Sequence, residues 1–181
     1  MEILNKNPLI IILSGKAGSG KSKTADIIKE IYKKDNKKAI SISYAFYLKE
    51  YAKNIVNWDG SESSKPRTFL QELGVDIIKN KIDKDMLINR VIEDIKVYSY
   101  FYDVIIISDA RFIEEIENIK NRFTNVKTIR VLGKDNNLID INKNHITETS
   151  LDNYNNYDYI VNNTSTIEEL YDKINDMLKG I

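Results

Sequence analysis

The sequence contains no cysteine, only one histidine and no long apolar run. A chain without cysteine can form neither disulfides nor thiolate metal sites, which agrees with a reducing compartment. The single histidine, His145, has no partner residues in an arrangement that favours a metal site. The longest apolar run covers residues 9–13, far short of a membrane span, and residues 1–8 lack the apolar core of a signal peptide. We therefore expect a soluble cytoplasmic protein, of a cell or of an infected host, that does not bind membranes.

An excess of positive charge is also missing, because 27 basic residues balance 27 acidic ones. Proteins that bind nucleic acid polymers usually carry a basic surface, so we expect no such partner. Hydrophobic residues make up 42% of the chain and charged residues 30%, an ordinary balance for a globular protein. A length of 181 residues suits one domain over residues 1–181, and the sequence leaves open whether this domain is a monomer or a homodimer.

Residues 10–22 combine an apolar run with a glycine-rich loop. Residues 15–22, Gly-Lys-Ala-Gly-Ser-Gly-Lys-Ser, match the pattern G-x-x-x-x-G-K-[ST] of loops that bind nucleoside triphosphates. The N–H groups of such a loop and the N-terminus of the next helix attract phosphates. We expect Lys21 to reach the β- and γ-phosphates of ATP, and the Ser22 hydroxyl to be a ligand of Mg²⁺. The residues predicted to bind ATP are Gly15, Lys16, Ala17, Gly18, Ser19, Gly20, Lys21, Ser22 and Lys23.

The rest of the chain alternates between strand and helix patterns. Apolar or alternating stretches predict strands at residues 10–14, 39–43, 103–109, 126–132 and 157–161. Helical spacing predicts helices between them, including one over residues 67–81 that uses Leu70, Leu73 and Ile77. Thr166 and Glu169 form a capping-box pattern at the start of the last helix. The pattern predicts an α/β fold with a five-stranded parallel sheet, the three-layer sandwich of P-loop NTPases.

Ligands of such sheets bind beyond the carboxyl ends of the strands, so the residues that follow each strand are the site candidates. Asp109 ends an apolar strand, where it is expected to hold Mg²⁺; the alternative is a cap for the helix that begins near Phe112. Arg111 has the geometry to bind a phosphate bidentately; the alternative is an ion pair with Glu114 or Glu115.

Further cationic and aromatic residues are candidates for the same carboxyl edge of the predicted sheet. Arg67 and Lys79 lie twelve residues apart and share a face if one continuous helix contains both. Arg130 lies in a strand between apolar neighbours and faces either the site or the polar side of the sheet. Several cations and no clear general base other than Asp109 favour a phosphate as the acceptor, because a phosphate is already ionised. Aromatic side chains that could stack on a nucleobase, or belong to the core, are Tyr44, Phe46, Tyr47 and Trp58.

Several of these stretches together resemble one family, the phage-type deoxynucleoside monophosphate kinases, which are related to adenylate kinase-like and phosphomevalonate kinases. They are the loop at residues 15–22, the tract 67–76, residues 108–112 with Glu115, residues 145–148 and residues 162–170. The resemblance implies an NMP kinase-like fold, with an acceptor-binding helical region at about 44–100 and a lid-like loop at about 133–157. It implies ATP and Mg²⁺ as cofactors, and small nucleotides as the substrates.

The resemblance also implies roles for individual residues. Lys21, Asp109 and Arg111 would be catalytic, and Ser22 and Asp109 would hold the metal. The acceptor would be bound by Lys49, Arg67, Gln71, Lys79, Arg111 and Arg130. Two features depart from the family: Lys79 stands where an arginine is expected, and residues 133–144 contain no arginine.

Two other functions fit the same residues. One is a kinase of another small phosphorylated or hydroxylated metabolite, phosphomevalonate-like or gluconate-like. The other is a protein that binds ATP without kinase activity. Turnover with nucleoside monophosphates separates these functions from the leading one, which is phosphoryl transfer from ATP to a deoxynucleoside monophosphate.

Overall fold

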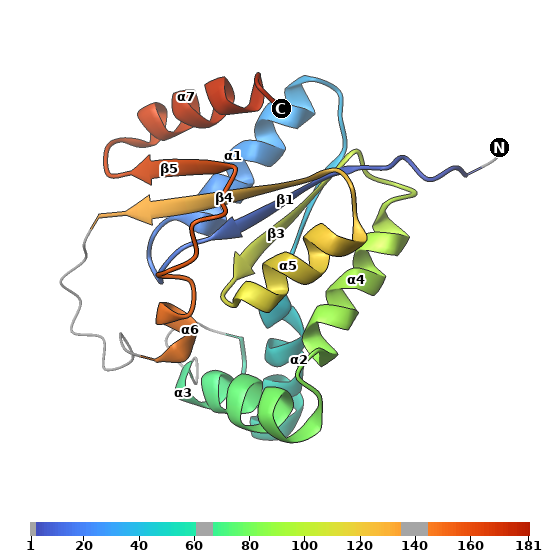
Figure 1. Cartoon of the computed structure of the whole chain (residues 1–181), viewed down its shortest axis with the longest axis vertical. Helices are drawn as coiled ribbons and strands as arrows, with labels where there is room; N and C mark the ends of the chain where they lie inside the picture. The colour runs from blue at the N-terminus through green and yellow to red at the C-terminus, as the bar shows by residue number, and fades with distance from the viewer. Residues whose placement is uncertain (1–2, 61–66, 135–144) are drawn as a thin grey trace.

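A computed structural model describes residues 3–60, 67–134 and 145–181 of the chain (Figure 1). Its centre is a five-stranded parallel sheet with the strand order β2-β3-β1-β4-β5. The strands are β1 (Leu9–Ser14), β2 (Ala39–Ile42), β3 (Val104–Ala110), β4 (Val126–Gly133) and β5 (Tyr159–Asn163). The predicted five-stranded parallel α/β fold is therefore confirmed.

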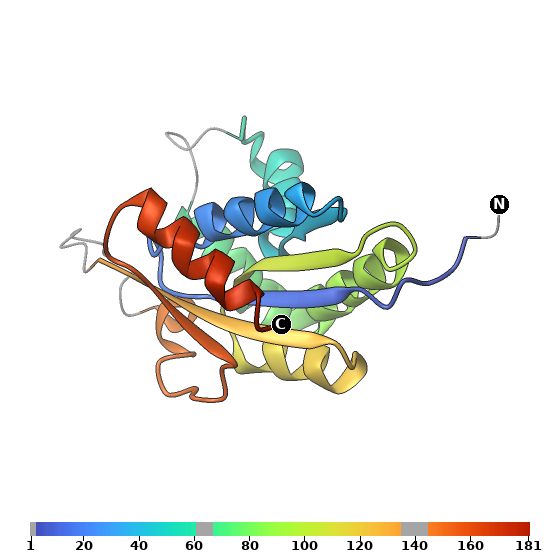
Figure 2. The same cartoon turned by 90° about the horizontal axis from the view of Figure 1, so that it is seen from above.

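Helices cover both faces of the sheet (Figure 2). One face packs against α1 (Lys21–Lys34) and α7 (Ile167–Leu178), and the other against α4 (Met86–Tyr98) and α5 (Ile113–Arg122). Side chains of β1 alternate between the two cores, with Ile11 in the first and Ile12 in the second. This two-sided burial explains why the central strands are apolar without interruption.

The carboxyl edge of the sheet is overlaid by α2 (Tyr44–Val56), α3 (Arg67–Gln71) and the π-helix η1 (Glu72–Ile82). Figure 1 shows α2 and α3 beyond the arrowhead of β3. These segments have a small core of their own, formed by Ala52, Trp58 and Leu70. These helices therefore form a part of the molecule beyond the sheet and its two covering layers.

The prediction of a single α-helix over residues 67–81 was wrong, because α3 gives way to a π-helix at Glu72. Leu73 and Ile78, five residues apart, are buried, whereas Ile77 is 40% exposed. A π-helix has i→i+5 hydrogen bonds, so its buried residues follow a wider spacing than those of an α-helix. The continuous α-helix on which the shared face of Arg67 and Lys79 depended is therefore not formed.

A short helix that the sequence analysis did not predict, α6 (Ile146–Thr149), follows His145. The Nδ1 atom of His145 accepts the N–H of Thr147 at 3.3 Å, so His145 caps this helix. At the start of α7 the Thr166 hydroxyl accepts the N–H of Glu169, as the capping pattern predicts. Of the helices in the part of the chain that is described, none is long and apolar enough to cross a membrane.

Candidate functional site

The glycine-rich loop at residues 15–22, called the P-loop from here on, joins β1 to α1 at the carboxyl edge of the sheet. Gly15 and Gly20 have φ angles of 152° and 95°, a region that other residues rarely adopt. A side chain at Gly15 would also collide with the carbonyl oxygen of Val131 in β4. The predicted strand, loop and helix are thus formed, with the N-terminus of α1 directed at the loop.

Lys21 lies in the first turn of α1, with its ammonium group inside the P-loop. Its Nζ atom donates to the carbonyl oxygens of Gly15 at 2.7 Å and Lys16 at 2.9 Å. Burial, together with the nearby positive charge of Arg111, lowers the pKa of Lys21 to about 7. The carboxylates of Glu148 and Asp109 raise the pKa of Lys21, but by less than burial lowers it. An anion in the loop would favour the charged form of this side chain.

Asp109 is the second-last residue of β3, and its carboxylate holds the start of α2. The N–H groups of Tyr44 and Ala45 each donate to one of its oxygens at 2.9 Å. Burial raises the pKa of Asp109, although these two hydrogen bonds favour the ionised form. The capping role considered for Asp109 is therefore real, but it concerns α2 and not the helix after Phe112.

Glu115 caps the helix that follows β3. Its Oε2 atom accepts the backbone N–H groups of Arg111 at 2.6 Å and Phe112 at 3.0 Å. Burial raises the pKa of Glu115 to about 8, and the nearby carboxylate of Asp109 raises it as well. A neutral Glu115 lets the two buried acids share the edge of the sheet without two full negative charges.

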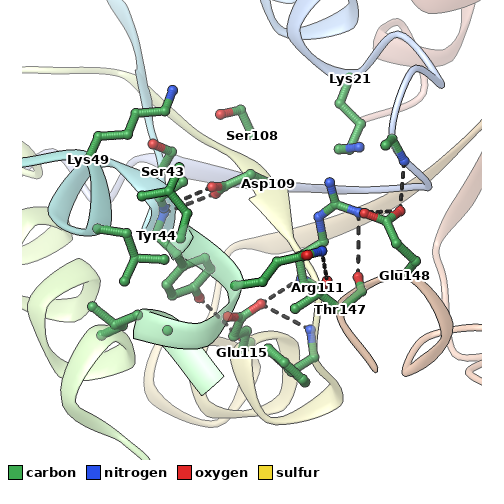
Figure 3. Close-up of a pocket in the computed structure, with 18 of the residues that line it drawn as sticks. Lys21, Ser43, Tyr44, Lys49, Ser108, Asp109, Arg111, Glu115, Thr147 and Glu148 are labelled. Carbon is green, nitrogen blue, oxygen red and sulfur yellow. Dashed lines mark hydrogen bonds and ion pairs between the residues drawn. The ribbon is translucent and has the colours of Figure 1, made fainter. Parts of the chain in front are cut away.

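Arg111 follows Asp109 and pairs with Glu148 of α6, not with Glu114 or Glu115 as the sequence alternative had it. Its Nη1 atom lies 2.8 Å from Oε2 of Glu148 and 3.4 Å from the carbonyl oxygen of Thr147. The same oxygen of Glu148 accepts the N–H of Ala17 in the P-loop at 2.9 Å. Figure 3 shows the Arg111 guanidinium between Lys21 and Glu148.

One cavity of about 670 Å³ connects the P-loop with the helices beyond the sheet. At one end it is lined by the P-loop, Asp109 and Arg111, and Lys49 of α2 lies across from Lys21 (Figure 3). Beyond this end its walls carry Gln71 and Glu115 among apolar and aromatic side chains. These apolar lining residues are Leu48, Leu70, Val75, Leu87 and Phe112. The cavity therefore has a cationic end and a more apolar end.

Two predicted acceptor residues whose side chains are described, Lys79 and Arg130, do not line this cavity. Lys79 lies 3.6 Å from the centroid of the Phe112 ring and 3.6 Å from a carboxylate oxygen of Glu114. The guanidinium of Arg130 lies 3.4 Å from Asp152, which also pairs with Lys16 of the P-loop. The backbone of Arg67 begins α3, and its side chain is outside the described residues.

The remaining predictions have mixed outcomes. Gln71 lies where expected, and its Nε2 atom donates to the Thr147 hydroxyl at 3.2 Å. Lys23 is exposed on α1 and does not line the cavity. Of the aromatic candidates, Tyr44 is buried, and its hydroxyl donates a hydrogen bond to the carbonyl oxygen of Glu115. Trp58 belongs to the small core of the helices beyond the sheet. Residues 135–144 of the expected lid lie outside the described part of the chain.

Sequence reasoning missed two residues of the site, Glu148 and Phe112. Glu148 belongs to the tract 145–148 that carries the family resemblance, but the tract alone gives no partner for its carboxylate. Phe112 was treated only as part of a helix face, although its ring lines the cavity. Their positions depend on contacts across the fold, which spacing along the chain does not encode.

A family model described as deoxynucleotide monophosphate kinase matches residues 32–174. No curated protein matches the chain. Among solved structures, the APS kinase CysC of Mycobacterium tuberculosis in complex with AMPPNP and APS is 11% identical, with a TM-score of 0.53 over 95% of this chain and 98% of that one. TT1252 from Thermus thermophilus is 13% identical, with a TM-score of 0.53 over 96% and 98% of the two chains. At these identities the likeness shows a shared fold.

Proposed function

Because the chain belongs to the deoxynucleotide monophosphate kinase family, which phosphorylates deoxynucleoside monophosphates with ATP, we propose that the cavity at the carboxyl edge of the sheet is where this transfer takes place. The observation that carries the proposal is the continuity of the cavity. It is lined by Lys21 of the P-loop, by Arg111 and by Lys49, so two phosphates can meet among these cations. The more apolar end of the cavity, beyond these cations, suits the nucleoside part of the acceptor.

The donor side is assigned to the P-loop. Its N–H groups and the N-terminus of α1 bind the phosphates of ATP, and Lys21 stabilises the charge that develops on the transferred group. Lys16 and Lys23 are secondary here, because Lys16 pairs with Asp152 and Lys23 is exposed. ATP phosphates that enter the loop replace the two carbonyl oxygens that Lys21 contacts in the protein alone.

The acceptor side is assigned to the region at about 44–100 together with the end of β3. Lys49 and Arg111 neutralise the acceptor phosphate, and Gln71 and Phe112 contact the nucleoside. Arg67 remains in the proposed set because it begins α3 beside Gln71. Lys79 and Arg130 are left out of direct contact, since Lys79 lies over Phe112, and Arg130 is held by Asp152.

The residues present fit a magnesium ion held mainly by ATP. Within the residues that the structure describes, no group of three or more His, Cys, Asp or Glu side chains forms a metal site by itself. Ser22 offers a hydroxyl on the cavity wall, and each oxygen of Asp109 retains a lone pair beside its one hydrogen bond. Bound Mg²⁺ would reduce the repulsion between the two phosphates, with Ser22 as a ligand and Asp109 nearby.

A phosphate acceptor also explains why the site needs no general base. The acidic side chains near the P-loop already accept hydrogen bonds: Asp109 from two N–H groups, Glu115 from two, and Glu148 from Arg111 and Ala17. A hydroxyl acceptor would require one of them to remove a proton, whereas a deoxynucleoside monophosphate arrives already ionised.

Steady-state ADP formation tests the proposal. We expect at least one of dAMP, dCMP, dGMP and dTMP to stimulate ADP formation far more than the corresponding deoxynucleoside. Arg111→Ala should raise the KM of that acceptor and lower kcat with a smaller effect on the KM of ATP, because Lys21 and the N–H groups of the P-loop remain in this variant. Arg122→Ala, on the exposed side of α5, is the matched control and should behave like wild type. Turnover with a nucleoside or sugar alcohol but with no deoxynucleoside monophosphate would overturn the proposal, and so would ATP binding without any turnover.

A further inference from the structure

We propose that Glu148 is a positioning residue for the transfer, which fixes the guanidinium of Arg111 between the donor and acceptor phosphates. The inference rests on the proposed function and adds a residue to it. Glu148 stands on α6, far in sequence from both groups that it contacts. Its side chain is only 6% exposed, so its negative charge is held among the partners that it has and not in bulk water.

A single oxygen of Glu148 joins the two halves of the site. Oε2 accepts the N–H of Ala17 at 2.9 Å and the Nη1 hydrogen of Arg111 at 2.8 Å. Ala17 belongs to the loop assigned to ATP, and Arg111 to the strand end assigned to the acceptor. The distance between these two elements is therefore set in part by one carboxylate, as in-line transfer between two bound phosphates requires.

The contacts of Arg111 also decide which edge of its guanidinium faces the cavity. The two N–H groups of Nη1 point to Glu148 and to the carbonyl oxygen of Thr147. Nε and Nη2 make no hydrogen bond to any residue within 3–60, 67–134 or 145–181. A guanidinium with Nη1 anchored retains the Nε–Nη2 edge, which is one of the two edges that bind phosphate bidentately.

Glu148 is itself held from two sides. His145 caps α6, and Gln71 of α3 donates to the Thr147 hydroxyl next to Glu148. A free arginine side chain loses conformational entropy when substrate binds, and this loss weakens binding. Because Glu148 already holds Arg111, most of that entropy is lost before the substrate arrives. The ion pair with Glu148 reduces the electrostatic attraction between Arg111 and phosphate. Its benefit is that it fixes the orientation of the guanidinium.

The test is Glu148→Gln, which keeps the shape of the side chain and removes its charge. We expect kcat/KM for the deoxynucleoside monophosphate to fall about 10- to 100-fold through misplacement of Arg111. The KM of ATP should change less than about threefold, because the other P-loop contacts remain. Glu93→Gln, on the exposed surface of α4 and away from the cavity, is the control and should match wild type, and melting temperatures of both variants show whether the fold is kept.

A double-mutant cycle separates a role through Arg111 from an independent one. In the Arg111→Ala background, Glu148→Gln should cost less than about a further twofold, because its target is already gone. Additive losses would overturn the proposal, and so would an increase in activity, which would mean that the carboxylate competes with phosphate. If wild type itself shows no turnover with any deoxynucleoside monophosphate, the proposed function fails; if wild type turns over and Glu148→Gln equals it, only the positioning role fails.

Discussion

At the scale of single residues, the protonation of Lys21 is the property most directly tied to ATP binding. Its pKa of about 7 in the protein alone reflects burial and the charge of Arg111. ATP phosphates placed beside the ammonium group favour its charged form, so the pKa of Lys21 rises when ATP binds. Between the two pKa values, binding therefore takes up protons, and the affinity for ATP increases as the pH falls.

Calorimetry at pH 8 in two buffers of different ionisation enthalpy measures this uptake. We expect up to about one proton to be taken up for each ATP bound. Lys29→Met, which alters an exposed lysine of the same helix, should leave the uptake unchanged. Proton release by wild type, or no exchange at all, would show that Lys21 is not the group that responds to the phosphates.

Glu115 gives a second residue-level prediction, in which stability is measured. Its pKa of about 8 in the folded chain lies above the ordinary value of 4.5 for a glutamate, so the folded state binds more protons than the unfolded state between these pH values. The contribution of Glu115 to the free energy of unfolding is therefore present at low pH and is lost as the pH rises toward 8. Glu115→Gln should keep one oxygen for the two N–H groups and lose this pH dependence.

The melting temperature of Glu115→Gln relative to wild type should accordingly be higher at pH 8 than at pH 5.5. Glu114→Gln, the exposed neighbour, provides the control. A relative melting temperature that stays the same between pH 5.5 and pH 8 would mean that the N–H groups of Arg111 and Phe112 keep Glu115 ionised in the folded protein.

Residue placement was predicted best where a strand end determines it. Lys21, Asp109 and Arg111 were expected at one edge of the sheet, and all three line the same cavity. Lys79 could not be placed from spacing, because the π-helix turns it toward the ring of Phe112. Glu148 could not be paired with Arg111, because the two residues are 37 positions apart and no local pattern links them.

At the scale of elements, the end of β4 supports the P-loop. A Cβ atom at Gly133 would lie 2.6 Å from the Cα atom of Ser19 and 3.3 Å from its carbonyl carbon. These neighbours are backbone atoms of the loop, so the loop or the strand would have to move to accommodate a methyl group. The glycine at the end of β4 is thus a packing requirement of the ATP site.

Gly133→Ala should therefore raise the KM of ATP on the order of tenfold by displacing the loop. The KM of the acceptor should change less, since the acceptor residues belong to other elements. Gly180→Ala, where a Cβ atom would lie 3.5 Å from the carbonyl oxygen of Met177, is the matched glycine control. An unchanged KM for ATP in Gly133→Ala would show that this contact does not hold the loop in place.

The sequence-based predictions were most accurate for continuously apolar strands and for helices with regular apolar spacing. β1 and β3 were placed within one residue at each end, because burial on both faces makes such strands continuously apolar. The π-helix η1 was missed because its wider turn is not visible to a test for α-helical spacing. α6 has four residues, too few for a periodic pattern, and it is fixed by contacts with the P-loop and α3.

At the scale of the whole molecule, the sheet brings distant segments to one edge. The P-loop, the end of β3, α2, α3 and α6 each contribute side chains to a single cavity, although they span residues 15–149. The order of strands and helices in the sequence was enough to predict this edge, because parallel strands share the direction of their carboxyl ends. The contribution of α6 to the wall of the cavity could not be predicted from this order and became visible only in the three-dimensional structure.

The most direct test of phosphoryl transfer in this cavity follows the γ-phosphate of labelled ATP. With Mg²⁺ and a deoxynucleoside monophosphate, wild type should produce the labelled deoxynucleoside diphosphate. Lys21→Ala should keep its fold and lose this activity by about two orders of magnitude or more, because the charge on the transferred group is no longer stabilised. Lys29→Ala, on the same helix, should retain it. Label that appears only as inorganic phosphate, or equal transfer by Lys21→Ala and wild type, would contradict the account.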